Sequence, residues 1–260
     1  MYVKAKKHLG QHFLRNEDAA LRITQGLTHH GGYRDVIEVG PGTGALTKYL
    51  VQRDDIDLTC IELDRESVAY LHVTWPQLKV VQGDLLGMDL SGIGSGPLAV
   101  IGNFPYNIST QIVFKVLENR DRVTEVVGMF QKEVADRLCA GPGSRTYGIT
   151  SVLAQVWYHM EPLFLVEPDA FIPPPKVRSA VIRMRRNERI EPPCDEKLLF
   201  RTVKAAFGQR RKTLHNALKS FDPLKGGVPV EFARKRAEEL SVEDFIALTL
   251  ACVGEELKKP

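Results

Sequence analysis

The sequence has few cysteines, no long apolar run and no internal repeat. Its 260 residues include four cysteines, namely Cys60, Cys139, Cys194 and Cys252. They are too far apart to form a close pair of metal ligands or a recognisable disulfide framework, so we expect reduced cysteines and no metal site. No segment is long enough to span a bilayer, and no apolar run follows the basic start of the chain as it would in a secretory signal. These absences predict a cytoplasmic protein that does not enter a membrane, with a monomer as the default state.

The chain also has little net charge. Its 35 lysines and arginines exceed its 32 acidic residues by three. The positive charge is nevertheless concentrated at residues 4–8, 183–189 and 210–212. Clustered cations favour a polyanionic partner, although such clusters are equally often ordinary solvated faces.

Short apolar runs alternate with helical patterns over the first half of the chain, which is 43% hydrophobic overall. Strands are predicted at residues 36–39, 58–63, 78–81, 98–101 and 123–130. Helices are predicted between and after them, at residues 45–52, 65–73, 110–119 and 132–139. This alternation is typical of a Rossmann-like α/β fold with a mostly parallel, doubly wound sheet, in which ligands bind beyond the carboxyl ends of the strands.

The pattern changes near residue 190. Residues 191–193 contain two prolines and predict a linker. Short helices are predicted after it at residues 198–207, 211–218, 231–240 and 243–252. We therefore expect a larger α/β domain over residues 1–189 and a small helical domain over residues 190–260. Two loops of the first domain are distinctive, a glycine-containing one at residues 141–148 and a proline-rich, extended one at residues 171–176.

The first predicted strand runs directly into a glycine-rich turn that contains Gly40, Gly42 and Gly44. Glycine permits positive φ angles and has no Cβ, so a ligand can lie against the main chain near the start of the following helix. The spacing departs from the full dinucleotide fingerprint. Taken alone, the motif is also compatible with a tight turn that binds nothing.

Acidic residues follow the next two predicted strands. Glu62 lies where a carboxylate can accept hydrogen bonds from both hydroxyls of a ribose. Asp84 lies where a carboxylate can accept from an adenine amino group, or can cap a helix. We expect Asp64 to cap the helix that begins at Arg65. Glycine, glutamate and aspartate at the ends of three neighbouring strands favour a ligand that contains adenosine.

The fourth predicted strand ends in Asn103, Phe104, Pro105 and Tyr106. An exocyclic amine is a poor nucleophile because its lone pair is delocalised into the base. The side-chain oxygen of Asn103 and the carbonyl of Phe104 can accept its two hydrogens, while Tyr106 stacks on the ring. No strong general base is needed, because the nitrogen becomes acidic after methyl transfer. The motif therefore favours S-adenosylmethionine over nicotinamide, although a structural turn can use the same residues.

At these residues the chain resembles the ribosomal RNA adenine dimethyltransferase family, and most closely its bacterial members that act on the small subunit. The likeness extends over nearly the whole chain, and begins with a segment similar to the family's opening motif, residues 6–14. The resemblance implies that Gln11, His12 and Leu14 contact the cofactor. The other cofactor contacts that we expect are Gly40, Gly42, Glu62, Asp84 and Asn103. The chain departs from the usual motif at His12, where the family has asparagine, and at Phe104, where it has leucine.

Three later segments also resemble the family. Residues 131–148 are similar to the segment that follows its catalytic motif. The segment at residues 171–179 implies that Phe171 lies against the target base opposite Tyr106, although an isolated phenylalanine is more often a core residue. The run at residues 206–214 implies that Arg210, Arg211 and Lys212 contact RNA phosphates.

The resemblance implies dimethylation at N6 of two neighbouring adenosines near the 3′ end of small-subunit (16S) ribosomal RNA, within a partly assembled small subunit. A basic surface binds phosphates without reading sequence, so the choice of site would depend on shape and on which adenines can be turned outward. Three alternatives stay open: a large-subunit adenine methylase, a ribosome-assembly factor without catalysis, and a DNA amino-methylase. The last would be expected to carry a separate target-recognition domain.

Overall fold

The computed structural model describes residues 3–189, 191, 193–224 and 227–254. The outermost residues of both predicted domains and Pro192 of the expected linker therefore lie outside the described residues. The chain divides into two compact units, one formed by Met1–Ala135 with Tyr158–Asn187 and one by Asp136–Trp157 with Glu188–Pro260. The chain passes from the first unit to the second for the last time between Asn187 and Glu188, close to the expected boundary at residue 190. The Asp136–Trp157 segment, which we had placed in the first domain, belongs to the second unit because its helix α6 (Ile149–Gln155) packs against α7 (Glu196–Gly208) and α10 (Val242–Ala251).

The first unit is built on a seven-stranded sheet in the order β4-β3-β2-β5-β6-β9-β7. Its first five strands are parallel: β4 (Lys79–Gln82), β3 (Asp57–Glu62), β2 (Asp35–Val39), β5 (Leu98–Asn103) and β6 (Val123–Gln131). All five predicted strands are confirmed, and the predicted ends differ from the observed ones by no more than two residues. Because the strands are parallel, their carboxyl ends meet at one edge of the sheet.

Two antiparallel strands complete the sheet and were not predicted, β7 (Tyr158–Val166) and β9 (Ser179–Arg186). The basic cluster at residues 183–189 belongs partly to β9, where Arg183 lies opposite Glu161 and donates to it at 2.7 Å. Arg186 donates to two backbone carbonyls, and Arg189 pairs with Glu243 at 2.6 Å. The arginines of this cluster therefore support the fold, and the interpretation of the cluster as a polyanion site is not favoured.

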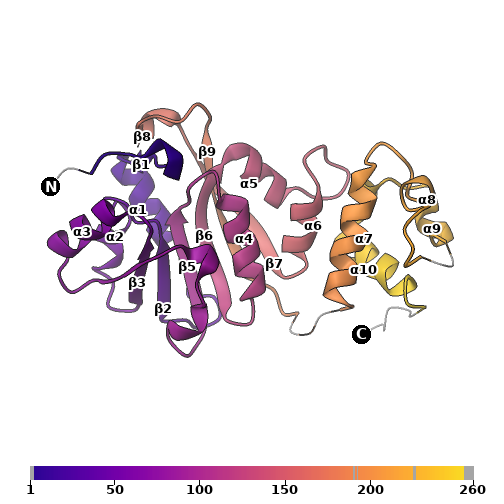
Figure 1. Cartoon of the computed structure of the whole chain (residues 1–260), viewed down its shortest axis with the longest axis horizontal. Coiled ribbons are helices and arrows are strands. Elements are labelled where there is room, and N and C mark those ends of the chain that lie inside the picture. Colours follow the sequence, from indigo (N-terminus) through magenta and orange to yellow (C-terminus); the bar gives the residue numbers. More distant parts are fainter. Residues whose placement is uncertain (1–2, 190, 192, 225–226, 255–260) are drawn as a thin grey trace. The chain divides into compact units, whose positions relative to one another are not determined.

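The first unit contains several helices beside its sheet (Figure 1), and two of them begin at a residue whose side chain caps the helix. Asp64 accepts from the backbone N–H of Glu66 and caps α3 (Arg65–Thr74), as predicted. Asn16 caps α1 (Glu17–Gln25), which was not predicted. The two other helices of this region are α2 (Thr47–Leu50) and α4 (Ser109–Glu118).

The core of the first unit lies between α1, α2 and one face of the sheet. Alternate residues of β5 and β6 face it, Ala99 and Ile101 from one strand and Val127 and Met129 from the other. A short antiparallel pair, β1 (Phe13–Leu14) with β8 (Phe171–Ile172), adds Leu14 and Phe171 to the same core. The N-terminal segment, residues 6–14, is thereby attached beside the edge of the sheet where a ligand is expected.

The second unit consists of helices. Besides α6, α7 and α10 it contains α8 (Leu214–Ala217), α9 (Val230–Ala233) and the short η5 (Ala237–Glu239). α5 (Lys132–Cys139) is shared between the two units. The predicted helix at residues 231–240 is thus divided into α9 and η5. Across the part of the chain that the structure describes, no helix has both the length and the apolar character needed to cross a bilayer.

Candidate active site

The glycine turn after β2 brings the main chain close to its neighbours. Gly40 has φ of 64° and Gly42 has φ of 57°, a region that favours glycine. A Cβ on Gly42 would lie 2.8 Å from the ring of Phe13. The turn therefore leaves an open cradle on the side of the N-terminal segment, which a side chain on Gly42 would fill.

Glu62, the last residue of β3, faces this cradle. Its carboxylate accepts hydrogen bonds from the backbone N–H of Gly42 at 2.9 Å and of Asp64 at 2.8 Å. The side chain is buried, and burial raises the pKa of Glu62, while the N–H donors of Asp64 and Gly42 work in the opposite direction. Each oxygen keeps acceptor capacity, so the carboxylate is held in place and can still accept from ribose hydroxyls.

Asn103, the last residue of β5, is oriented by the N-terminal segment. Its Nδ2 donates to the backbone carbonyl of His12 at 2.8 Å. Among the described residues no group donates to Asn103 Oδ1 or to the carbonyl of Phe104, and both residues line a cavity. The Phe104 side chain is buried and meets Phe130 edge-on at 5.2 Å. The residue as a whole is 1% exposed, and its backbone carbonyl keeps its acceptor capacity.

Tyr106 is fixed by Ser179 on β9. The two hydroxyl oxygens are 2.5 Å apart. Burial raises the pKa of Tyr106, so its hydroxyl stays neutral. Since Ser179 is fully buried, the ring of Tyr106 is held in one orientation beside Asn103.

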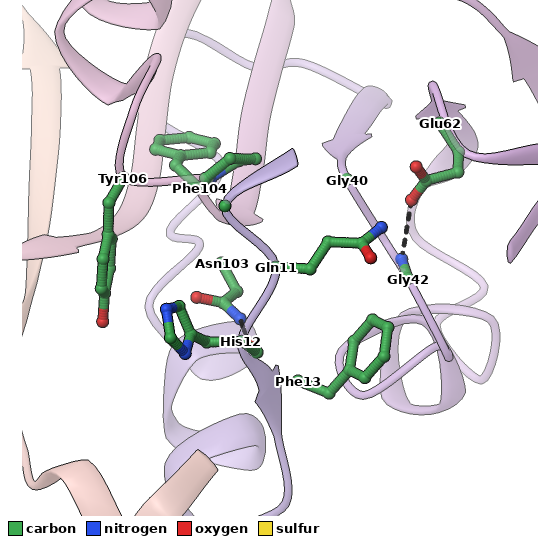
Figure 2. A pocket seen from close by; sticks show the side chains of 11 residues that line it. Gln11, His12, Phe13, Gly40, Gly42, Glu62, Asn103, Phe104 and Tyr106 are labelled. Carbon is green, nitrogen blue, oxygen red and sulfur yellow. Dashed lines mark hydrogen bonds between the residues drawn. The ribbon is translucent and has the colours of Figure 1, made fainter. Parts of the chain in front are cut away.

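The N-terminal segment turns two side chains in opposite directions (Figure 2). Gln11 extends toward Gly40 and Gly42, whereas the His12 ring lies beside Asn103 and Tyr106. His12 Nδ1 is 2.7 Å from the carbonyl of Pro173, and its ring stacks on Tyr106 with 5.5 Å between centroids. His12 is thus on the side of the Asn103 oxygen, and Gln11 is on the side of the glycine turn.

Two adjoining cavities share Gln11, Gly40, Glu62 and Pro105 as walls. The first is completed by Gly10, His12, Phe13, Gly42, Asn103, Phe104 and Tyr106. The second is lined by Asp84 and by apolar residues that include Leu63, Leu85 and Ile108. A largely apolar cavity with the Asp84 carboxylate on one side and Glu62 on the wall shared with the first cavity suits a purine that carries an amino group. The first cavity is lined by the residues that carry the predicted amine-holding oxygens.

Comparison with known protein families identifies the family of this chain. A family model described as ribosomal RNA adenine dimethylase matches residues 2–249. The chain belongs to this family. The dimethylase is therefore a methyltransferase, and its methyl donor is S-adenosylmethionine.

Curated relatives of this dimethylase match it over nearly their whole length. A protein of Cytophaga hutchinsonii named ribosomal RNA small subunit methyltransferase A is 53% identical over 249 residues, covering 95% of this chain and 96% of the relative. A protein of the same name from Flavobacterium johnsoniae is 52% identical, covering 95% of each chain.

Two solved structures resemble this dimethylase closely. A dimethyladenosine transferase from Plasmodium falciparum superposes with a TM-score of 0.77 at 23% identity, covering 95% of this chain and all of the other, which supports the fold. The 23S rRNA methyltransferase ErmE superposes with a TM-score of 0.67 at 25% identity, covering 90% of this chain and 98% of the other.

The residues present fit the methyl donor of this dimethylase. The glycine cradle leaves room beside the main chain, Glu62 offers acceptors for ribose hydroxyls, and Asp84 stands at the edge of the apolar cavity. When bound, S-adenosylmethionine supplies an electrophilic methyl group on a sulfonium. No group of three or more metal-ligating side chains occurs among the described residues.

Three predicted contacts have a different local role from the simplest expectation. Asp84 Oδ1 caps the short η2 (Leu85–Gly87) by accepting from Leu86, so the capping interpretation holds while Asp84 also lines the second cavity. Leu14 is a core residue and lines neither cavity. Phe171 is 1% exposed in the same core, because β8 pairs with β1. The ring that faces Tyr106 is that of His12, and the contact of Phe171 with a base stays a prediction.

Sequence reasoning did not single out Glu38, which is 1% exposed beneath the glycine turn. Thr47 Oγ1 donates to its carboxylate at 2.7 Å, and Cys60 Sγ lies 3.5 Å away. Burial raises the pKa of Glu38 to about 7, although the hydrogen bond from Thr47 opposes this. The signal for it was an acidic residue inside an otherwise apolar strand.

The residues predicted to contact RNA belong to the second unit. Arg210 Nε pairs with Glu238 Oε2 at 2.8 Å, and its Nη2 donates to the carbonyl of Ser144 at 3.3 Å. Arg211 and Lys212 are exposed and form no ion pair with any residue that the structure describes. Two of the three predicted cations are therefore available, and Arg210 mainly joins parts of its own unit.

Proposed function

We propose that this dimethylase converts two neighbouring adenosines near the 3′ end of small-subunit (16S) ribosomal RNA to their N6-dimethyl forms, within an assembling small subunit in the cytoplasm, and acts as a monomer. The observation that carries the proposal is a pair of oxygens, on Asn103 and Phe104, that accept no hydrogen bond from any described residue and belong to residues lining the first cavity. Asn103 is fixed through its nitrogen, so its oxygen is presented to the cavity. The carbonyl of Phe104 lies directly after it in the chain.

The pair of acceptors matches the chemistry of an adenine amino group. Oδ1 of Asn103 accepts one hydrogen and the Phe104 carbonyl accepts the other, which directs the nitrogen lone pair away from both acceptors. Tyr106, fixed by Ser179, presents a flat ring on which the base stacks. Holding the amine in this orientation lowers the barrier through positioning. The proton leaves the nitrogen after the methyl group has been added, so the site does not require a strong base.

Selection of the small subunit is supported by the names of the relatives that match this chain over almost its full length. The resemblance of residues 131–148 and 171–179 to the small-subunit group supports it as well. The structural likeness to ErmE, whose name refers to 23S rRNA, keeps a large-subunit substrate as the alternative. A role as an assembly factor alone is less well supported, because Gly40, Glu62 and Asn103 line the first cavity and Asp84 lines the second.

The test is methyl transfer from labelled S-adenosylmethionine to unmethylated small subunits, large subunits and duplex DNA, followed by digestion and identification of the labelled nucleoside. We expect label only in small subunits, as N6-dimethyladenosine at two adjacent positions. Label in large subunits would favour the alternative substrate. Binding to small subunits without any transfer would overturn the enzymatic assignment.

A further inference from the structure

One face of α7 is basic and exposed. Lys197, Arg201 and Lys204 lie at spacings of four and three residues, which places them in one row along the helix. All three are exposed, and Phe200 of the same face is 41% exposed. The opposite face of α7 is buried, and its residues are Leu199, Thr202, Val203 and Ala206. The basic row is therefore the side of α7 that its own unit leaves uncovered.

The positive charge of this row is not compensated locally. None of its three cations forms an ion pair with any residue that the structure describes. The acidic residues of the helix are confined to its start, at Asp195 and Glu196. This differs from Arg210, whose charge is balanced by Glu238. The exposed pair Arg211 and Lys212 follows the helix directly and extends the positive charge.

Aromatic rings are interleaved with these cations. Phe200 lies between Lys197 and Arg201 in the sequence, and the Arg201 guanidinium lies 5.8 Å from the centre of the Phe221 ring. Much of the apolar ring of Phe200 is exposed to water, and a partner that covers the ring would bury this apolar surface. Cations beside a flat apolar ring are what single-stranded nucleic acid needs, since phosphates bind the cations and a base stacks on the ring.

We propose that this face of α7 (Lys197, Phe200, Arg201 and Lys204) is a binding site for an unpaired segment of ribosomal RNA, with one base stacked on Phe200 and the neighbouring phosphates on the three cations. The proposal rests on the proposed function, which supplies RNA as the partner. An acidic peptide would satisfy the charges and leave the ring of Phe200 without a flat partner. A duplex would present no free base, so an unpaired segment fits better.

The charges are tested by the salt dependence of binding to unmethylated small subunits. The triple variant K197Q/R201Q/K204Q keeps good helix formers on the surface, and we expect it to weaken binding and to reduce the slope of log Kd against log salt by about 2. The matched control K219Q/R234Q/R236Q removes the same charge from other exposed positions of the same unit. We expect the slope of the control to stay close to that of the unchanged protein. Equal slopes for the two triple variants would overturn the proposal, since only net charge would then matter.

Stacking is tested separately at Phe200. Phe200→Leu keeps an apolar side chain without a flat ring, and Phe200→Trp offers a larger ring. With a single-stranded oligoadenylate as probe, we expect the leucine variant to raise Kd roughly tenfold at an unchanged salt slope. The tryptophan variant should retain the affinity. Wild-type affinity in the leucine variant would overturn the stacking role, as would a loss in both variants at an unchanged melting temperature.

These measurements are independent of the proposed reaction. If unchanged protein fails to methylate small subunits, the proposed function fails, whereas the α7 site is judged on Kd and salt slope alone. If methylation occurs and both triple variants bind alike, the α7 site fails and the proposed function stands.

Discussion

Asn103 has two hydrogen-bonding ends, and the structure commits them to different tasks. Its nitrogen donates to the His12 carbonyl, and its oxygen, which accepts from no described residue, is the one that we propose to hold the substrate amine. The same bond ties the N-terminal segment to the end of β5. A change at this residue therefore affects both amine orientation and the attachment of that segment, and the two effects can be separated by the choice of substitution.

The first prediction is that Asn103→Ala lowers kcat for methyl transfer by roughly 10²–10³, because it removes one of the two acceptors that orient the amine. The Kd for small subunits should change little, since the proposed RNA-binding cations lie in other parts of the chain. Asn103→Asp serves as control: it keeps oxygen acceptors and loses the donor to His12, so we expect activity between those of wild type and the alanine variant. Single-turnover transfer from labelled donor measures both. Turnover of the alanine variant at the wild-type rate would contradict the amine-holding role.

Phe171 allows a sharper comparison of two interpretations. In the structure Phe171 belongs to the same core cluster as Leu14 and does not line the first cavity. We predict that Phe171→Leu lowers the free energy of unfolding by about 1 kcal/mol while kcat changes less than twofold, as expected for a hydrophobic exchange in a core. His12→Ala should instead raise KM for small subunits, because His12 faces Tyr106. A large loss of kcat in the leucine variant at normal stability would show that the ring reaches the target base.

At the scale of elements, the site depends on how the N-terminal segment meets the ends of the strands. The segment is attached by the β1–β8 pair and by the contact of Gly10 with the loop after β5. Gly10 has φ of 66°, and a Cβ there would lie 2.6 Å from Asn107 Oδ1. The backbone angle favours glycine, and a Cβ would also require the side chain of the exposed Asn107 to move.

We predict that Gly10→Ala displaces the segment and weakens binding of S-adenosylmethionine by about tenfold, because Gln11 is then shifted from the glycine turn, at a cost of about 1.4 kcal/mol. Gly32→Ala is the matched control. Gly32 has a similar φ of 72°, yet a Cβ there would meet nothing within 4 Å. Titration calorimetry with the donor measures both variants. Equal weakening in the two variants would show that backbone strain, not the contact with Asn107, is responsible.

The sequence was sufficient for the parallel half of the sheet and insufficient for the antiparallel half. Buried parallel strands are nearly continuous apolar runs, which β2 and β5 display. In contrast, β7 contains Glu161 and Pro162, and β9 carries three half-buried arginines, so neither looks like a strand in isolation. β7 and β9 form because they pair with strands that are distant in the sequence, and the local sequence pattern carries no information about that pairing.

In the candidate site, too, some features could be predicted from the sequence and others could not. Glu62 and Asn103 could be predicted because they follow recognisable strands and parallel strands end together. The orientation of His12 could not, since it depends on the carbonyl of Pro173, which is distant in the sequence. The burial of Phe171 depends likewise on the pairing of β8 with β1. The positions of residues at the ends of parallel strands were predictable, and contacts made by the N-terminal segment and by β8 were not.

At the scale of the whole molecule, the two units divide the work. The first unit carries the proposed donor and amine sites, and the second carries the cations that we propose to bind RNA. The first unit also contains two buried carboxylates, Glu38 and Glu62, at the edge of its sheet. Buried carboxylates reduce stability when ionised, so these two residues make the stability of the folded state depend on pH.

The last prediction concerns that sensitivity. Burial raises the pKa of Glu38 to about 7, above its unfolded value of 4.5. The folded state then binds the proton more tightly than the unfolded state, so the contribution of Glu38 is fully present below pH 4.5 and is lost as pH rises to about 7. The loss should amount to roughly 3 kcal/mol. Glu38→Gln cannot titrate and still accepts from Thr47. Urea unfolding followed by Trp75 fluorescence, in a Trp157→Phe background, should therefore show wild type losing stability relative to the glutamine variant between pH 5 and 7. A constant difference across that range would mean that Glu38 ionises like an ordinary carboxyl group.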